Sequence, residues 1–226
     1  MSQWPLWIGA PISVIAVVGL VNAFNMIDGI DGLAGGTAIV ACLTLATSQL
    51  LFGTSHHTEY LLIFCCAVAG YLSVNLTITT KRKVFLGDAG SLLIGFVIAW
   101  AVIFITQSPK PSAPAGLALW SIALPVWDTL AVMTRRIRKG LSPFHADRTH
   151  LHHICLRAGL NNRQALGLLL AFSLACYGVG AVTFAIAGEI AALALFGICG
   201  LAFVMLQMRI WKVLVWVRLN TLPSPG

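Results

Sequence analysis

Charged residues are scarce in this chain: Asp, Glu, Lys and Arg make up only 9% of its 226 residues, and seven of them are acidic. A soluble domain carries about 25% charged residues, so most of this chain cannot face water. The six cysteines form no CxxC pair and no metal-ligand spacing. They are therefore read as small apolar residues of a packed interior.

Long hydrophobic runs take up most of the sequence, of which 58% is hydrophobic. A membrane-spanning helix needs about 20 predominantly apolar residues. On this basis we predict an all-α fold, a polytopic membrane helix bundle that forms a single domain over residues 1–226. About seven transmembrane helices are expected, at residues 9–27, 36–53, 60–79, 91–107, 115–134, 166–187 and 190–209.

The net charge of +7 is distributed as in a membrane protein and gives no indication of a nucleic-acid partner. If residues 80–90 are cytoplasmic, the alternation of spans puts residues 54–59 and 108–114 outside. Thirteen of the fourteen Lys and Arg residues then lie on the cytoplasmic side, and only Lys110 lies outside. The positive-inside rule accounts for this distribution.

The same orientation places the beginning of the chain outside the membrane. Residues 1–10 contain no Lys or Arg, and they lack the basic region and cleavage site of a signal peptide. The chain is therefore expected to begin in the middle of a larger membrane protein.

Three polar segments, 22–36, 75–91 and 135–153, interrupt the apolar pattern. Each falls at the cytoplasmic end of a predicted span, so segments far apart in sequence are expected to meet at one face of the membrane. The longest polar stretch, 135–165, is the predicted cytoplasmic catalytic loop.

The first polar segment combines amides, acids and glycines. Asp28 and Asp31 are three residues apart, so helical geometry would place them on one face, with Asn22 and Asn25 one turn back. An ionised Asp at membrane depth costs about 2.5–3.5 kcal/mol on insertion scales and needs a cation, a partner or water. Asp and Gly are also ordinary at helix ends and turns, but two Asn and two Asp in phase favour a functional site.

The other two segments offer a metal ligand and a phosphate site. Asp88 precedes an apolar span, where it could cap a helix or bind Mg²⁺ through its carboxylate. The loop around Arg148 contains four His residues within nine positions. This loop suits phosphate better than zinc, because no second Cys or His pair supports a zinc site. A solvated loop is the alternative. The remaining intramembrane acid, Asp128, is either a site residue or a partner for a loop cation.

Together the segments NAFNMIDGIDGL, VFLGDAGSLLIGF and RRIRKGLSPFHADRTHLHHICLRAGL resemble the polyprenyl-phosphate N-acetylhexosamine-1-phosphate transferases, of glycosyltransferase 4 type. They look closest to the branch that transfers GlcNAc-1-phosphate from UDP-GlcNAc to undecaprenyl phosphate. That branch starts O-antigen and enterobacterial common antigen synthesis. The similarity runs from about residue 20 to residue 165.

The resemblance implies roles for individual residues. It implies that Asp88 binds Mg²⁺, or Mn²⁺ in its place, with Asn25 near the metal. It implies a catalytic or sugar-nucleotide role for Asp28 and Asp31, a place in the substrate site for Asn22, and contacts to uracil from Phe85 and Asn75. His150, His152, His153 and Arg148 are expected to face the diphosphate.

The resemblance further implies an enzyme of the bacterial inner membrane whose site faces the cytoplasm. The UDP-sugar and the polyprenyl phosphate would react there in the first step of a cell-envelope polysaccharide, such as lipopolysaccharide. The sugar epimer, the polyprenyl length and homodimer formation stay open.

The chain departs from the family in one respect. Members have about ten or eleven spans and an earlier cytoplasmic segment with an adjacent acidic pair, whereas this chain has no such pair. It is therefore read as the C-terminal part of that fold. An inactive fragment or assembly partner of a transferase is the alternative function. A transporter is less favoured, because its polar site would lie near the membrane midplane.

Overall fold

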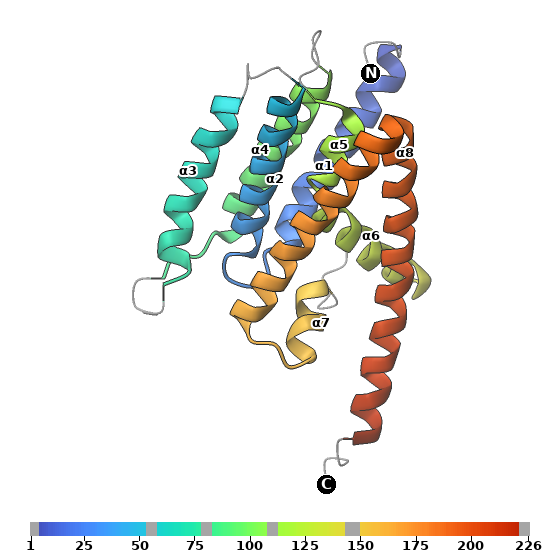
Figure 1. Cartoon of the computed structure of the whole chain (residues 1–226). Coiled ribbons are helices and arrows are strands. Elements are labelled where there is room, and N and C mark those ends of the chain that lie inside the picture. The colour runs from blue at the N-terminus through green and yellow to red at the C-terminus, as the bar shows by residue number, and fades with distance from the viewer. Residues whose placement is uncertain (1–4, 53–57, 78–82, 108–112, 143–149, 222–226) are drawn as a thin grey trace.

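The computed structural model describes residues 5–52, 58–77, 83–107, 113–142 and 150–221, and the side chains among them apart from Leu6 and those after residue 210. Within these ranges the regular structure is entirely helical, as expected (Figure 1). The helices are α1 (Leu6–Ile27), α2 (Leu33–Leu51), α3 (Thr58–Asn75), α4 (Gly87–Gln107), α5 (Ala115–Trp120), α6 (Ala123–Arg138), α7 (Leu151–Arg157) and α8 (Asn162–Thr221).

Five of these helices are long and apolar enough to cross a membrane: α1, α2, α3, α4 and α8. The chain is thus a multi-pass membrane protein. Gly188 interrupts α8 with φ 80° and ψ −175°, a backbone conformation that is essentially restricted to glycine. The chain reverses direction there (Figure 1), so α8 contains both predicted spans, 166–187 and 190–209.

The predicted span 115–134 is wrong as a continuous helix. The chain forms α5 and α6 instead, with a turn at Ser121 and Ile122 between them. Pro125 supplies the physical reason, because a proline ring clashes with the carbonyl four residues earlier, here that of Ser121, and donates no hydrogen bond. The break gives α6 a direction different from that of α5 (Figure 1).

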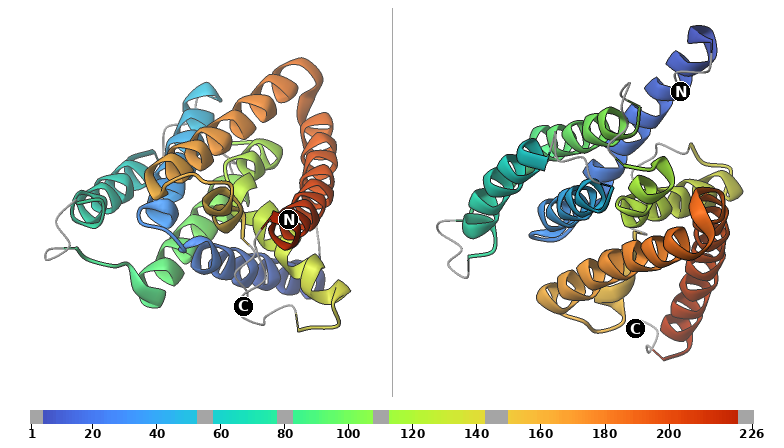
Figure 2. Two further views of the ribbon diagram at one scale, coloured as in Figure 1. Left: turned by 90° about the horizontal axis from the view of Figure 1, so that it is seen from below. Right: turned by 45° about the horizontal axis from the view of Figure 1, so that its top comes forward.

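Helix α2 is the centre of the bundle. Of its membrane span, 78% is buried, against 17–39% for the other four spanning helices. It packs against α3, α4 and α8, while α1 packs against α4 and α6. Seen from below, α3 lies at one edge of the bundle and the distal part of α8 lies at the opposite edge (Figure 2).

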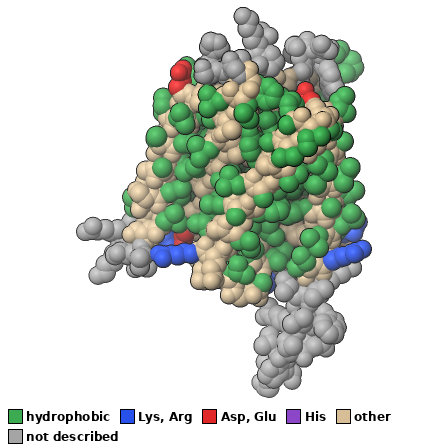
Figure 3. Space-filling view, viewed as in Figure 1, with side chains coloured by type: hydrophobic (Ala, Val, Ile, Leu, Met, Phe, Trp, Pro, Cys, Tyr) green, Lys and Arg blue, Asp and Glu red, His purple; other side chains and the backbone are tan. Residues whose placement is uncertain are grey.

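The face of the molecule drawn in Figure 3 has an apolar side wall, and the charged side chains visible on it lie near the two ends. Figure 3 shows a broad hydrophobic band, with Lys and Arg side chains gathered near the lower end of the view. The links from α1 to α2 and from α3 to α4 lie at this same end, as does α7 (Figure 1). The expected convergence of separate polar segments at one end of the bundle is therefore seen for their described parts.

Candidate functional site

A close approach of two helices positions the metal-site candidates. Gly95 of α4 lies against α1, where an added Cβ would come within 2.7 Å of the Cα of Val21. Small residues at such crossings let helix backbones pack closely in membranes. One turn further along α1, Asn25 Nδ2 donates to Ser91 Oγ at 2.9 Å and to Asp88 Oδ1 at 3.2 Å. Asn25 therefore orients the Asp88 carboxylate at the start of α4.

The spacing of Asp28 and Asp31 predicted that they share a helix face, and this prediction is wrong. Helix α1 ends at Ile27, and residues 28–32 form the turn into α2. Gly32 makes the turn feasible with φ 78°, a left-handed conformation that costs glycine little. The glycine-rich sequence thus breaks the helix between the two acids and the amides that precede them.

The turn nevertheless brings three carboxylates into one electrostatic group. The pKa of Asp28 is raised to about 6, first by burial and then by the negative charges of Asp31 and Asp88. Both causes disfavour the ionised form of the carboxyl group. A group of acids in this state would be stabilised by a bound cation.

Lys83 is the cation that lies beside this group in the structure. It forms an ion pair with Asp31, and its Nζ also lies 5.5 Å from the centre of the Phe85 ring. Phe85 itself is 72% exposed, so its ring is available to a ligand. Asn75 is buried and donates to the carbonyl oxygen of Val84 at 2.9 Å, while its own amide oxygen has no hydrogen-bond partner within the described ranges.

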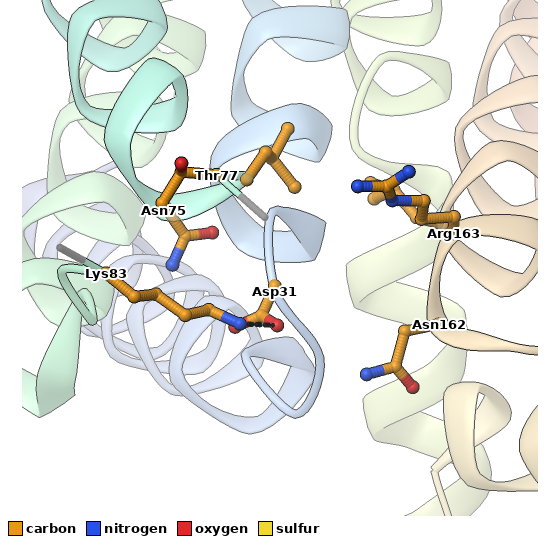
Figure 4. A pocket seen from close by; sticks show the side chains of 8 residues that line it. Asp31, Asn75, Thr77, Lys83, Asn162 and Arg163 are labelled. Carbon is orange, nitrogen blue, oxygen red and sulfur yellow. Dashed lines mark hydrogen bonds and ion pairs between the residues drawn. The ribbon is translucent and has the colours of Figure 1, made fainter. Parts of the chain in front are cut away.

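A pocket of about 260 Å³ opens at this position (Figure 4). Asp31, Asn75 and Lys83 line one side, and Asn162 and Arg163 face them from the start of α8. The sequence analysis did not single out Asn162 or Arg163. An Asn-Asn-Arg run after a glycine turn is common at helix starts, and only the fold brings it opposite Asp31.

The histidine loop is divided between two environments. His150 is buried, and its Nδ1 lies 2.8 Å from Asp128 Oδ2. Asp128 also accepts from the backbone N–H of Leu151 at 2.9 Å and from Gln207 Nε2 at 2.8 Å. Asp128 therefore joins the histidine loop to α8 through hydrogen bonds. Arg148, expected at the diphosphate, lies outside the described residues.

His152 reaches toward the acidic turn, which is the turn formed by residues 28–32 with Asp28 and Asp31. His152 is 2% exposed, and a Cβ added to Gly29 would lie 2.0 Å from its Nε2. Among the residues that the structure describes, neither ring nitrogen has a hydrogen-bond partner. Burial, followed by the neighbouring His153 and His150, lowers its pKa to about 4. His152 is therefore neutral at physiological pH, and its ring packs against the residue between Asp28 and Asp31.

The other predicted residues are placed less directly. The His153 ring lies 4.2 Å from that of His152, and His153 is more exposed than either His150 or His152. The side chain of Asn22 donates to the Val18 carbonyl oxygen of its own helix at 2.7 Å. Among the residues that the structure describes, no three His, Cys, Asp or Glu side chains are grouped closely enough to hold a metal ion by themselves.

Comparison with known proteins addresses the ancestry of this arrangement. Residues 1–106 match the model of glycosyl transferase family 4. A curated relative from Escherichia coli O157:H7 is 41% identical over 186 residues, which is 79% of this chain. The chain is thus similar to glycosyl transferase family 4 over its first 106 residues.

Other curated relatives are similar to this chain to the same degree. A protein from Haemophilus influenzae is 41% identical over 219 residues, or 93% of this chain. One from Yersinia pestis is 39% identical over 186 residues. All three are named undecaprenyl-phosphate alpha-N-acetylglucosaminyl 1-phosphate transferase. The chain spans 50%, 60% and 51% of the lengths of these three proteins, respectively. It therefore spans about half the length of the curated relatives it matches.

Proposed function

We propose that this chain carries the sugar-nucleotide site of a transferase that moves GlcNAc-1-phosphate from UDP-GlcNAc to undecaprenyl phosphate. The observation that supports this proposal most directly is the juxtaposition of Asp28, Asp31 and Asp88 with a pocket that also presents Lys83 and Arg163. The names of the relatives point to the same reaction.

The proposed reaction is a phosphoryl transfer. A phosphate oxygen of the polyprenyl phosphate forms a bond to the β-phosphorus of the UDP-sugar, and the bond from that phosphorus to the bridging oxygen breaks, which releases UMP. Catalysis of such a step depends on positioning and on neutralising charge. Because one reactant is water-soluble and the other stays in the bilayer, a site at the membrane surface serves both.

The residues present fit a divalent cation, Mg²⁺ or Mn²⁺. Mg²⁺ is typically held by one or two carboxylates, with waters and substrate phosphates completing its coordination, so a full set of protein ligands is not required. Asp88, oriented by Asn25, is the proposed principal ligand. When bound, the cation would neutralise charge on the diphosphate. It would also relieve the repulsion that raises the pKa of Asp28.

The pocket of Figure 4 is the proposed place of the nucleotide. Exposed Phe85 would stack on the uracil, and the unpaired amide oxygen of Asn75 would accept a hydrogen bond from it. Lys83 and Arg163 supply positive charge to the diphosphate from opposite sides of the pocket. His153 and Arg148 remain proposed diphosphate contacts.

We expect the rate of UMP release to depend jointly on pH and on Mg²⁺. At low Mg²⁺, the rate should fall as the pH drops below about 6, because Asp28 becomes protonated there. A higher Mg²⁺ concentration favours the ionised form and should move this acid limb to lower pH. Rates measured from pH 5 to 8 at two Mg²⁺ concentrations test this expectation, and an acid limb that does not move would contradict it.

The same pKa shift has a consequence for stability. Because the pKa of Asp28 in the folded state lies above its ordinary value of 3.8, the free energy of unfolding should fall as the pH rises from about 4 to about 6. A cation bound at the acidic group would remove this loss.

The proposed location is the bacterial inner membrane, with the site on the cytoplasmic face. We expect cysteines introduced at Glu59 and Lys139 to be labelled from opposite sides, because α3 begins at one end of the bundle and α6 finishes at the other. A membrane-impermeant maleimide applied to intact cells should label Glu59→Cys and spare Lys139→Cys until the cells are opened. Labelling of both from outside would overturn the orientation.

One assay addresses the proposal as a whole. The purified chain is supplied with UDP-GlcNAc, undecaprenyl phosphate and Mg²⁺ and assayed for UMP release, and release would support the proposal. Because the chain spans about half of its relatives, a second candidate is an assembly partner without activity of its own. Binding of UDP-GlcNAc in the absence of UMP release would favour that candidate. If the chain neither binds UDP-GlcNAc nor releases UMP, the proposed site is refuted.

A further inference from the structure

The most completely hydrogen-bonded buried acid in the described part of the chain lies outside the acidic turn. Asp128 of α6 is 1% exposed, in a helix that otherwise buries mainly apolar residues at this depth. It accepts three hydrogen bonds, from His150, from the backbone of Leu151 and from Gln207. A buried carboxylate is costly unless it is paired and hydrogen-bonded in this way.

The three donors come from two separate parts of the chain. His150 and Leu151 form the beginning of α7, whereas Gln207 belongs to the part of α8 beyond Gly188. Gln207 is also buried, and its amide oxygen has no hydrogen-bond partner in the described part of the chain. A half-satisfied buried amide costs free energy that an apolar side chain would avoid. What Gln207 contributes here is its one hydrogen bond to Asp128.

Asp128 and Gln207 act on the acidic turn through α7. His152 is two residues beyond His150, the two rings are 5.8 Å apart and nearly parallel, and His152 packs against Gly29. The contacts therefore form a continuous path from Gln207 through Asp128 and His150 to the turn that holds Asp28 and Asp31.

We propose that Asp128 and Gln207 are positioning residues of the transferase: they fix α7 so that His152 supports the Asp28–Asp31 turn. This inference rests on the proposed function for its effect on transfer, but not for its effect on α7. It assigns a functional role to the distal part of α8, which lies at the edge of the bundle. It also separates the histidine loop into two buried residues that hold the site and His153, which is more exposed than either.

The chain contains its own reporter of α7. Cys155 is buried on this helix, where it packs with Ile27, Ile30 and Leu33 beneath the acidic turn. Release of α7 would expose its thiol, so alkylation of Cys155 by N-ethylmaleimide, quantified by mass spectrometry, measures the position of α7 without an activity assay. Cys155→Ala identifies the signal. Ser173→Ala is the matched control, because Ser173 is a buried polar residue of α8 whose hydroxyl donates to the Leu169 carbonyl oxygen within the same helix.

Two substitutions of Gln207 separate the hydrogen bond from simple packing. Gln207→Leu keeps most of the volume and removes the donor. Gln207→Glu donates to Asp128 only while the introduced carboxyl is protonated, and burial beside the Asp128 carboxylate favours this neutral form. The titratable groups that hydrogen-bond in this network are Asp128 from α6 and His150 from the start of α7.

In the full chain we expect Gln207→Leu to raise Cys155 alkylation about tenfold and to lower kcat for UMP release about tenfold, with less change in KM. Both measurements, Cys155 alkylation and kcat, are expressed relative to wild type at the same pH. On this scale Gln207→Glu should behave like the wild type at pH 6 and like Gln207→Leu at pH 8.5. Unchanged alkylation in Gln207→Leu, or a Gln207→Glu variant without pH dependence, would overturn the inference. If the wild type releases no UMP, the proposed function fails, while the alkylation results still decide whether these residues hold α7.

Discussion

Replacing Asp88 with Asn should lower the rate of UMP release at least about 100-fold and leave membrane insertion intact. The amide preserves the size of the side chain and a hydrogen-bond partner for Asn25, but it removes the negative charge that a divalent cation needs. A 100-fold loss corresponds to about 2.7 kcal/mol of barrier. The measurement is UMP release at saturating Mg²⁺ with equal amounts of protein in the membrane.

Glu59→Gln is the matched control for this experiment, since it makes the same chemical change at an exposed residue of α3 at the other end of the bundle. Its rate should equal that of the wild type. Asp88→Asn should also raise the Mg²⁺ concentration required for half-maximal rate. If the variant keeps more than about a tenth of the wild-type rate, the loss is under about 1.4 kcal/mol, and Asp88 is not the principal ligand.

The fold could be predicted well wherever an apolar run was uninterrupted. The spans that became α1 to α4 and the two halves of α8 follow from length and hydropathy alone. The span 115–134 failed because a hydropathy window does not register that one proline, Pro125, disrupts the hydrogen bond to Ser121. That break is also what lets α6 present Asp128 to α7.

The acidic turn shows what residue spacing can predict and what it cannot. Asp28, Asp31 and Asp88 could be singled out because acids are rare in so apolar a chain. Their arrangement could not be derived from helical spacing, because residues 28–32 form a turn that glycine makes possible and do not continue the helix. The tertiary partners were still less accessible: Gln207 is 79 residues from Asp128, and no local pattern relates them.

The same limit applies to the histidine loop. Four histidines in nine positions predicted a functional segment, and the resemblance assigned all of the later three to the diphosphate. The structure buries His150 and His152 and leaves His153 more exposed. Spacing along a short helix could not distinguish which ring faces a neighbouring helix, because that depends on how α7 docks. The contact between His152 and Gly29 therefore offers a direct test of how the docking of α7 controls the acidic turn.

Replacing Gly29 with Ala should lower the rate of UMP release at least about 30-fold, with little loss of protein from the membrane. An added Cβ would lie 2.0 Å from His152 Nε2 and 2.4 Å from Cε1, far inside contact distance, so the ring or the turn must move. The ring is buried and α7 is anchored through Asp128, so we expect the turn with Asp28 and Asp31 to be displaced. Displacement of reacting groups by about 1 Å can cost about 100-fold in rate.

Gly19→Ala is the control for this change, because Gly19 lies in α1, the helix that leads into the turn, and an added Cβ there would meet nothing within 4 Å. The double variant Gly29→Ala with His152→Ala then identifies the cause. Removal of the ring makes room for the methyl group, so the double variant should recover at least about tenfold over Gly29→Ala if His152 acts by packing. No recovery, together with an equal loss in His152→Ala alone, would show that the ring itself takes part in transfer. A Gly29→Ala variant as active as Gly19→Ala would show that the placement of α7 against the turn does not control the site.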